Sequence, residues 1–221
     1  MAFLFSRESD YKLRQIITGL GLVIILFIAG FYYYAYPQYT RVGFNPDQPV
    51  PFSHQIHAGQ LGMDCRYCHN NVEDSPHATV PATQVCMNCH NPAKANIKGN
   101  SPLLTEVRDS WKTGYPIEWK RIHQLPGYAY FNHSVHIARG VSCVSCHGKI
   151  NEMPVVFHAK PLTMGWCLSC HNHPEEAVRP LQEVTHLNWE PEPGKTQEEI
   201  GQEIVRRTGI HPPNHCGACH R

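Results

Sequence analysis

Every cysteine in the chain belongs to one of five copies of the pentapeptide Cys-x-x-Cys-His. The copies are Cys65/Cys68/His69, Cys86/Cys89/His90, Cys143/Cys146/His147, Cys167/Cys170/His171 and Cys216/Cys219/His220. Two thiols at this spacing occur in zinc sites, in redox-active dithiols and in the covalent attachment sites of c-type haem. The residue that follows the second thiol distinguishes these three chemistries.

The histidine after each thiol pair favours haem attachment. In such a site both thiols add to the vinyl groups of the haem, and the next residue, His, binds the iron from one face. A zinc site does not need a histidine there every time, and a redox dithiol usually has none. Since all five copies carry it and no cysteine is left over, the sequence predicts five covalently bound haem c groups. The predicted proximal ligands are His69, His90, His147, His171 and His220.

A second pattern, Phe-x-His-x-x-His, occurs twice in the chain. It reads FSHQIH at 52–57 and FNHSVH at 131–136, and each copy precedes two attachment motifs. A single histidine, His77 in the first half and His158 in the second, lies nine residues before the second motif of its half. We interpret this order as a duplicated module that binds two haems, with the fifth motif following the second copy.

The order of these residues resembles the class III multihaem cytochromes c, in which the histidines of the repeat bind haem iron opposite the proximal ligand. A second histidine gives a low-spin iron suited to electron transfer, whereas an open position suits catalysis. The resemblance implies that His54 serves the haem on Cys65/Cys68 and that His57 serves the haem on Cys86/Cys89. It likewise assigns His133, His136 and His158 to the haems on Cys143/Cys146, Cys167/Cys170 and Cys216/Cys219, respectively.

Weaker candidates for distal ligation are His77, His173, Met153 and Met164. The resemblance leaves His77 without a haem in its own module, so ligation between the modules is an alternative. A methionine ligand would raise the potential of one haem, but a methionine beside a haem more often packs against it. The other histidines, and His173 if it is not a ligand, are expected to face solvent or to bond haem propionates: His123, His186, His211 and His215.

Residues 16–36 (IITGLGLVIILFIAGFYYYAY) form a stretch of 21 mostly apolar residues. As a helix this stretch is about 31 Å long, which matches the hydrocarbon core of a bilayer. A cleaved signal peptide usually has a shorter apolar region that small residues follow, so an uncleaved signal anchor is favoured. Basic residues precede the stretch and tyrosines surround its far end: Arg7, Lys12 and Arg14, and Tyr32, Tyr33, Tyr34, Tyr36 and Tyr39. These flanks predict a cytoplasmic N-terminus and a haem domain on the periplasmic side, where haem c is attached.

Five haems that share residues 41–221 leave about 36 residues for each, too few for an ordinary hydrophobic core. We therefore expect a mostly irregular and α-helical multihaem cytochrome c with little β-structure, in which the macrocycles form much of the core. The predicted segments are 1–15 (cytoplasmic), 16–36 (transmembrane), 41–91 (first dihaem module), 92–128 (intermodule segment), 129–174 (second dihaem module) and 175–221 (extension with the fifth haem).

The chain also resembles a narrower family, the pentahaem cytochrome c subunit of alternative complex III, a bacterial quinol:electron-acceptor oxidoreductase. The resemblance rests on PFSHQIHAG before the first motif, on WKRIHQLPGYAYFNHSVH before the third and on the fifth motif, and it covers nearly the whole chain. It implies that quinol is oxidised in a polytopic membrane subunit and that electrons reach this chain through an iron–sulfur subunit related to molybdopterin oxidoreductases. A monohaem cytochrome subunit, a soluble cytochrome c, a copper protein or a terminal oxidase would then receive them.

Two other functions stay open at the level of sequence. A standalone membrane-anchored quinol dehydrogenase is compatible with a single anchor, although the Phe-x-His-x-x-His repeat is not the pattern associated with that family. A multihaem reductase, for example of nitrite, needs one open iron, whereas the distal candidates here outnumber the irons. In the favoured interpretation the chain relays electrons and has no catalytic residues of its own. Its formal net charge of +1 gives no indication of a nucleic-acid partner.

Overall fold

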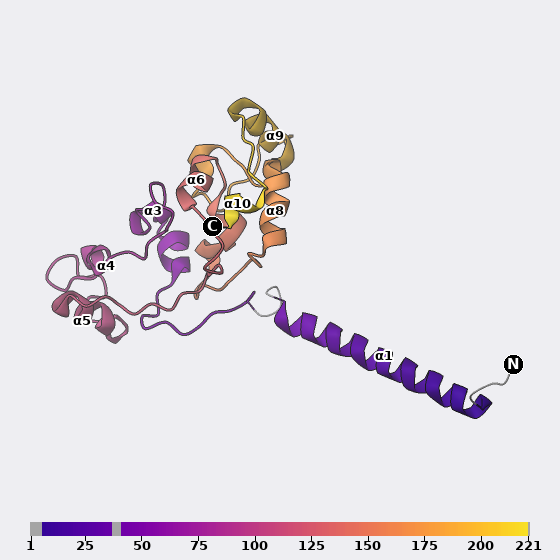
Figure 1. Cartoon of the computed structure of the whole chain (residues 1–221). Helices are drawn as coiled ribbons and strands as arrows, with labels where there is room; N and C mark the ends of the chain where they lie inside the picture. The colour runs from indigo at the N-terminus through magenta and orange to yellow at the C-terminus, as the bar shows by residue number, and fades with distance from the viewer. Residues whose placement is uncertain (1–5, 37–40, 221) are drawn as a thin grey trace. The chain divides into compact units, whose positions relative to one another are not determined.

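The computed structural model describes residues 6–36 and 41–220. The chain divides into two compact units, Met1–Arg41 and Val42–Arg221, which are described separately (Figure 1). The first unit contains one long helix. The second unit contains all five Cys-x-x-Cys-His motifs and is built from short helices and loops.

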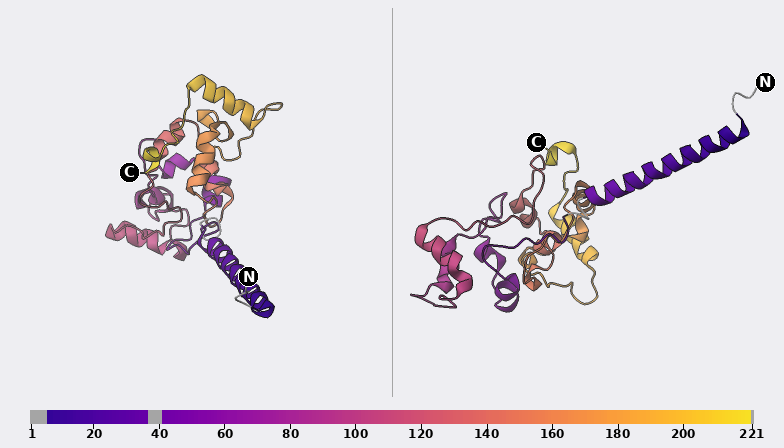
Figure 2. Two further views of the ribbon diagram at one scale, coloured as in Figure 1. Left: turned by 45° about the vertical axis from the view of Figure 1, so that its right-hand side comes forward. Right: turned by 90° about the horizontal axis from the view of Figure 1, so that it is seen from below.

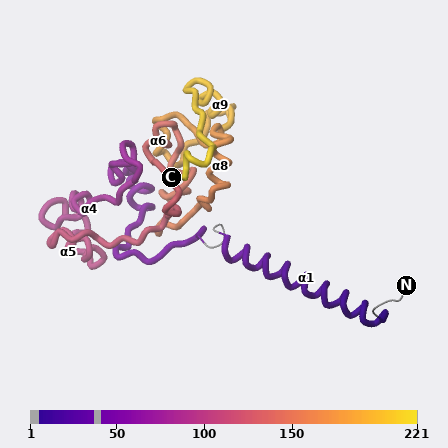
Figure 3. The backbone as a smooth tube through the Cα atoms, viewed as in Figure 1, coloured from indigo at the N-terminus to yellow at the C-terminus, as the bar shows by residue number. Residues whose placement is uncertain are grey.

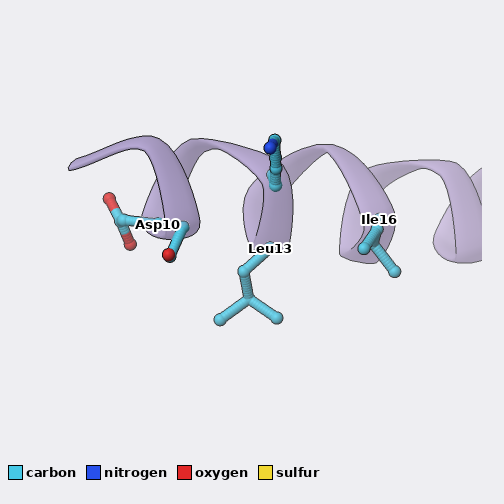
Figure 4. Close-up of a pocket in the computed structure, with 5 residues that line it drawn as sticks. Asp10, Leu13 and Ile16 are labelled. Carbon is cyan, nitrogen blue, oxygen red and sulfur yellow. The ribbon is translucent and has the colours of Figure 1, made fainter. Parts of the chain in front are cut away.

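Helix α1 (Arg7–Ala35) begins well before the apolar stretch because its first turns are stabilised by polar side chains. The Ser6 hydroxyl accepts a hydrogen bond from the Ser9 backbone N–H at 3.2 Å and caps the helix. Lys12 pairs with Glu8 at 2.7 Å, one turn earlier along the exposed surface. Figure 4 shows that the side chains along α1 change from polar to apolar, since Asp10 is followed by Leu13 and Ile16.

Within the described residues, α1 is the one helix long and apolar enough to cross a membrane, judged by length and composition. The side chains of the apolar stretch are exposed, and Tyr32 stacks on Tyr36 with a centroid distance of 5.0 Å near the end of the helix. The predicted apolar helix is therefore confirmed, whereas its orientation across the membrane stays a prediction. Tyr39, the last tyrosine of the predicted aromatic belt, lies outside the described residues.

The second unit has many short helices and almost no β-structure (Figure 2). The helical segments are η1 (Gln55–Gln60), α3 (Cys65–Cys68), α4 (Thr83–His90), η2 (Pro102–Leu104), α5 (Thr105–Thr113), α6 (His133–Ala138), α7 (Cys143–His147), η3 (Ile150–Glu152), α8 (Met164–Asn172), η4 (Pro174–Glu176), η5 (Leu181–Glu183), α9 (Gln197–Thr208) and α10 (Cys216–Cys219). In the described part of this unit, extended pairing is limited to two isolated bridges, Ala129–His220 and Val141–Val178. The predicted fold class is confirmed, and the boundaries predicted within the unit stay predictions.

Two small hydrophobic clusters lie apart from each other in the second unit. One contains Val50, Met87 and Val107, beneath α4 and α5. The other contains Val178 and residues of and after α9, and α4 and α9 lie at opposite ends of the unit (Figure 3). Clusters of this size bury little apolar area, which agrees with the expectation that protein side chains alone do not form the core.

Helix α9 has well-formed ends and a tight contact in its middle. Thr196 and Glu199 form a reciprocal capping box, and Gly209 ends the helix in the left-handed conformation with φ of 63°. Gly201 faces η4 so closely that a Cβ atom built there would lie 1.9 Å from the Glu175 carbonyl oxygen. A glycine is therefore required where α9 crosses this backbone segment.

We predict that Gly201→Ala destabilises the second unit by about 1–3 kcal/mol, because the added methyl group forces α9 away from the backbone at Glu175. Thermal unfolding of the purified protein measures this effect. Gly127→Ala is the matched control, since no atom lies within 4 Å of a Cβ built at Gly127. Equal melting temperatures for the two variants would show that α9 can move without cost.

Candidate functional site

Each Cys-x-x-Cys-His motif forms a short helical turn. The five motifs lie in α3, α4, α7, α8 and α10 or end in the residue that follows them. Residues three apart on a helix share a face, so the two thiols of each motif point to the same side. Cys216 is exposed and the other nine cysteines are partly buried, and all ten are free thiols. This arrangement lets both thiols of a motif reach one edge of a flat ligand.

The two thiols of the second motif, Cys86 and Cys89, have different surroundings. Cys86 packs against the hydrophobic cluster beneath α4 and α5, whereas Cys89 lies outside that cluster. The Cys89 carbonyl oxygen accepts a hydrogen bond from the Ile97 N–H at 2.9 Å, and the Ile97 carbonyl oxygen lies 2.5 Å from Nδ1 of His90. The loop at Ile97 therefore holds the end of the second motif. Cys89 is a free thiol here, so its predicted bond to haem stays a prediction.

The two Phe-x-His-x-x-His segments have the same ring packing in both halves of the chain. Phe52 meets His54 edge-on at 4.8 Å and stacks on His57 at 4.3 Å. Phe131 repeats both contacts at 4.7 Å and 4.4 Å with the histidines of the second segment. The backbones differ, since the first segment forms the π-helical turn η1 and the second forms α6. The phenyl ring therefore sets the directions of both imidazoles in either backbone.

Three histidines of these segments face the predicted proximal ligands at nearly constant distances. The ring centroids are 6.2 Å apart for His57–His90, 6.4 Å for His133–His147 and 6.2 Å for His136–His171. A metal–nitrogen bond is about 2 Å long and the centroid lies about 1 Å behind the nitrogen, so two imidazoles on one metal ion are about 6 Å apart. The planes of these pairs make angles of 64°, 10° and 43°, respectively.

Backbone carbonyl groups orient most of these imidazoles. In six histidines the Nδ1 atom lies within hydrogen-bond distance of a backbone carbonyl oxygen, where an Nδ1–H donates: His57, His69, His90, His133, His136 and His171. An Nδ1–H that donates to a carbonyl leaves the lone pair on Nε2, where it can bind a metal ion. The three facing pairs thus fit haem iron in their spacing, and these six histidines fit it in their tautomer.

His54 and His147 have buried Nδ1 atoms without a hydrogen-bond partner among the described residues. The pKa of His54 falls to about 4, chiefly because the ring is buried and also because the imidazoles of His69 and His57 lie near it. Burial likewise lowers the pKa of His147 to about 3. Both rings are therefore neutral at physiological pH, which is the form that binds metal ions.

The structure places His123 and His158 together beside the third motif. His158 is 2% exposed and its ring lies 5.2 Å from that of His123, with nearly parallel planes. His123 also meets His147 edge-on at 4.4 Å and is partly buried, so it does not face solvent, and a bond to a haem propionate stays a prediction. No repeat or spacing marked His123, and only its position in the intermodule segment could have drawn attention to it. The ring of His220, in the fifth motif, lies 5.7 Å from the ring of Tyr128, measured between centroids. The assignment of His158 to the haem of the fifth motif stays a prediction.

The weaker candidates occupy different environments. His77 is exposed but close enough to His133 to affect it electrostatically. His173 is exposed, with its Nδ1 atom 3.4 Å from a carboxylate oxygen of Glu175. Met153 is 6% exposed and approaches Gly148, whereas Met164 is 62% exposed. Buried packing is the simplest role for Met153.

The paired thiols and the facing histidines define the class of protein as a multihaem cytochrome c. The family described as cytochrome c7 and related cytochrome c matches residues 50–109 and 129–221, and the chain belongs to this family.

Among curated proteins, the chain is similar to the multiheme cytochrome c subunit of the menaquinone reductase of Nitratidesulfovibrio vulgaris (strain Hildenborough). The two are 31% identical over 129 residues, which is 58% of this chain and 56% of the relative. The chain thus spans about half the length of the curated relative that it matches.

Asp64, which precedes the first motif, forms a polar link between distant segments. Its carboxylate accepts hydrogen bonds from the Arg66 side chain at 2.9 Å and from the Thr185 hydroxyl at 3.0 Å. The hydrogen bonds from Arg66 are the main reason that the pKa of Asp64 falls from 3.8 to about 2, and the bond from Thr185 also lowers it.

We predict that Asp64→Asn weakens the acid sensitivity of the fold. The pKa of Asp64 is lower in the folded protein than its ordinary value of 3.8, so the carboxylate stabilises the fold above pH 3.8. This contribution is lost as the pH falls through about 2. Unfolding midpoints in denaturant, measured from pH 7 to pH 2, should be lower at pH 7 for the variant and should change less between pH 4 and pH 2. Asp74→Asn, which alters an exposed carboxylate nearby, should keep the wild-type slope.

Proposed function

We propose that the chain is a membrane-anchored pentahaem cytochrome c that relays electrons between a quinol-oxidising membrane complex and a periplasmic acceptor. The observation that carries the proposal is the set of three histidine pairs with centroids 6.2–6.4 Å apart, each containing one Cys-x-x-Cys-His histidine. Two imidazoles per iron leave no position for a substrate, which favours relay over catalysis.

The residues of the chain have distinct roles toward the haems. The paired thiols would tether each macrocycle, and the Nε2 atoms of the facing histidines would bind its iron. Backbone carbonyls hold six of these imidazoles in the tautomer that binds a metal ion. When bound, each haem takes up and gives up one electron. The rings of Phe52 and Phe131 keep the distal histidines in place through the stacked contacts at 4.3 Å and 4.4 Å.

The proposed iron ligands are assigned from the contacts between histidine rings, for those haems at which the structure shows such a contact. His57, His133 and His136 would share an iron with His90, His147 and His171, which their rings face. His54 would share one with His69, whose ring is close enough to lower its pKa. The sequence pattern assigns His158 to the fifth haem, on Cys216/Cys219, but its ring lies beside His123 and the third motif, so the contacts assign no distal ligand to the fifth haem. His77, His173, Met153 and Met164 stay secondary candidates.

The proposed partners are those of alternative complex III. They are an iron–sulfur subunit related to molybdopterin oxidoreductases, polytopic quinol-binding subunits and a monohaem cytochrome subunit. The apolar helix α1 supports a membrane location, and the similarity to a menaquinone reductase subunit supports a quinone-linked complex. Helix α1 would anchor the haem domain on the periplasmic side.

A second candidate function differs in the direction of electron flow. The similar protein is named as a subunit of a menaquinone reductase, which favours delivery of electrons to the quinone pool rather than their removal from it. The haem sites would be the same in both cases. Reduction of the haems in membranes by added quinol, or their oxidation by added menaquinone, distinguishes the two directions.

Native electrophoresis of membranes in mild detergent, with haem staining and mass spectrometry of the stained band, tests the complex directly. We expect a large band that contains polytopic subunits and an iron–sulfur subunit. A band of this chain alone, with quinol oxidation by the purified chain, would instead identify a standalone quinol dehydrogenase.

We predict that His136→Ala converts one haem per chain from low spin to high spin, because His136 faces His171 at 6.2 Å. The high-spin haem should bind carbon monoxide, which optical titration of the reduced protein measures. His186→Ala is the matched control, since His186 is exposed and its Nδ1 atom bonds Glu183. Carbon monoxide binding of the same extent in both variants, or in neither, would remove His136 from the ligand set.

A further inference from the structure

We propose that the five haem sites form a row in the order second, first, third, fourth, fifth, so that the two modules join through the first and third sites. Each site is named here by the position of its Cys-x-x-Cys-His motif along the sequence. The proposal rests on the proposed function in one respect, that each motif carries one haem. It assigns the second and fifth sites to the ends of the row, which sequence order alone does not do.

The second site contacts the first through residues inside both motifs. The Asn88 side-chain amide donates a hydrogen bond to the Tyr67 hydroxyl at 3.0 Å, and each residue lies between the two cysteines of its own motif. The thiols of Cys68 and Cys86 are close enough to interact electrostatically. These contacts put α4 next to α3.

The first site contacts the third by direct interaction of thiols from different modules. The Cys65 and Cys143 side chains lie close enough to interact electrostatically. A shared segment holds both motifs. The Thr185 hydroxyl bonds Asp64 at 3.0 Å, and the Val184 carbonyl oxygen accepts hydrogen bonds from the Ser142 hydroxyl at 2.8 Å and from the Cys143 N–H at 3.3 Å.

A second pair of segments joins the same two sites. The backbone N–H of His133 donates to the Pro76 carbonyl at 3.2 Å, and its Nδ1 atom lies 2.8 Å from the same oxygen. The N–H of Ser134 donates to Ser75 at 3.3 Å. The distal histidine of the third site is thus held by the loop that follows the first motif, so the module junction is built from ligands and attachment residues themselves.

The third site contacts the fourth within the second module. His136, which lies before the third motif, faces His171 of the fourth motif at 6.2 Å. The Cys146 thiol is partly buried and interacts electrostatically with both thiols of the fourth motif, Cys167 and Cys170. No segment of the first module is needed for this junction.

The fourth site contacts the fifth through the segment that leads into the last motif. The Nδ1 atom of His171 lies 2.7 Å from the Pro213 carbonyl oxygen, and the Asn214 amide lies 3.4 Å from the Asn172 side-chain oxygen. The thiols of Cys167 and Cys219 interact electrostatically. The exposed Cys216 makes the fifth site the more accessible end of the row.

A comparison of two variants of the full-length holoprotein tests the order. Cys65→Ala/Cys68→Ala removes the first haem, and replacement of both Cys86 and Cys89 by alanine removes the second. Intact mass should give five haems for the wild type and four for each variant. A wild type with fewer than five haems would refute the pentahaem proposal. The order of the sites is tested independently, by measuring which site is the neighbour of the third.

Paramagnetic relaxation measures which site is the neighbour of the third. The third site has imidazole planes 10° apart, which gives a rhombic low-spin signal, and loss of that signal in His133→Ala assigns it. Because dipolar relaxation falls steeply with distance, loss of the first haem should reduce the half-saturation power of this signal by about half, and loss of the second should leave it unchanged. The reverse result, or equal effects, would overturn the order.

A map of iron positions in the wild-type holoprotein gives the same test without substitutions. Anomalous scattering from crystals locates the irons, and the attached cysteines identify them. We expect the nearest irons to the first to be the second and the third. A second iron that lies beside the third, with the first at an end, would overturn the proposal.

Discussion

The architecture depends on one requirement, that two imidazoles face each other at about 6 Å with their Nε2 atoms directed inward. One imidazole of each pair follows a thiol pair in sequence, and its partner comes from another segment. Backbone carbonyls fix six of these rings, and two of the carbonyls come from distant segments, Pro76 for His133 and Pro213 for His171. In the proposed function, the loops are therefore shaped by the orientation that these histidines need, and regular secondary structure has a minor part.

This requirement explains why the duplicated modules differ in backbone but agree in side-chain packing. Phe52 and Phe131 make the same two contacts with their histidines, although one segment is a π-helical turn and the other an α-helix. The two copies share the placement of their imidazoles, which the proposed binding of haem iron requires. A π-helical turn at such a place is a common local adjustment at functional sites.

Much of this could be predicted from sequence because the chemistry is local. The thiols and proximal histidines are adjacent in the chain, and the apolar run of α1 is continuous, so motif and periodicity are sufficient. The start of α1 at Arg7 depends on the Ser6 cap and on ion pairs, which hydropathy does not register. The different surroundings of Cys86 and Cys89, which the motif treats alike, and the position of His123 depend on loops that carry no periodic signal. Tertiary contacts between irregular segments decide them.

The attachment motifs in α3 and α10 lie on helices of only four residues. A helix of this length cannot persist alone in water, since nucleation costs more than so few hydrogen bonds return. If haem is attached to these motifs as proposed, they would be flexible peptide before attachment and could adapt to the enzyme that attaches it. In the proposed function, bound haem would therefore be what fixes the conformation of these two motifs.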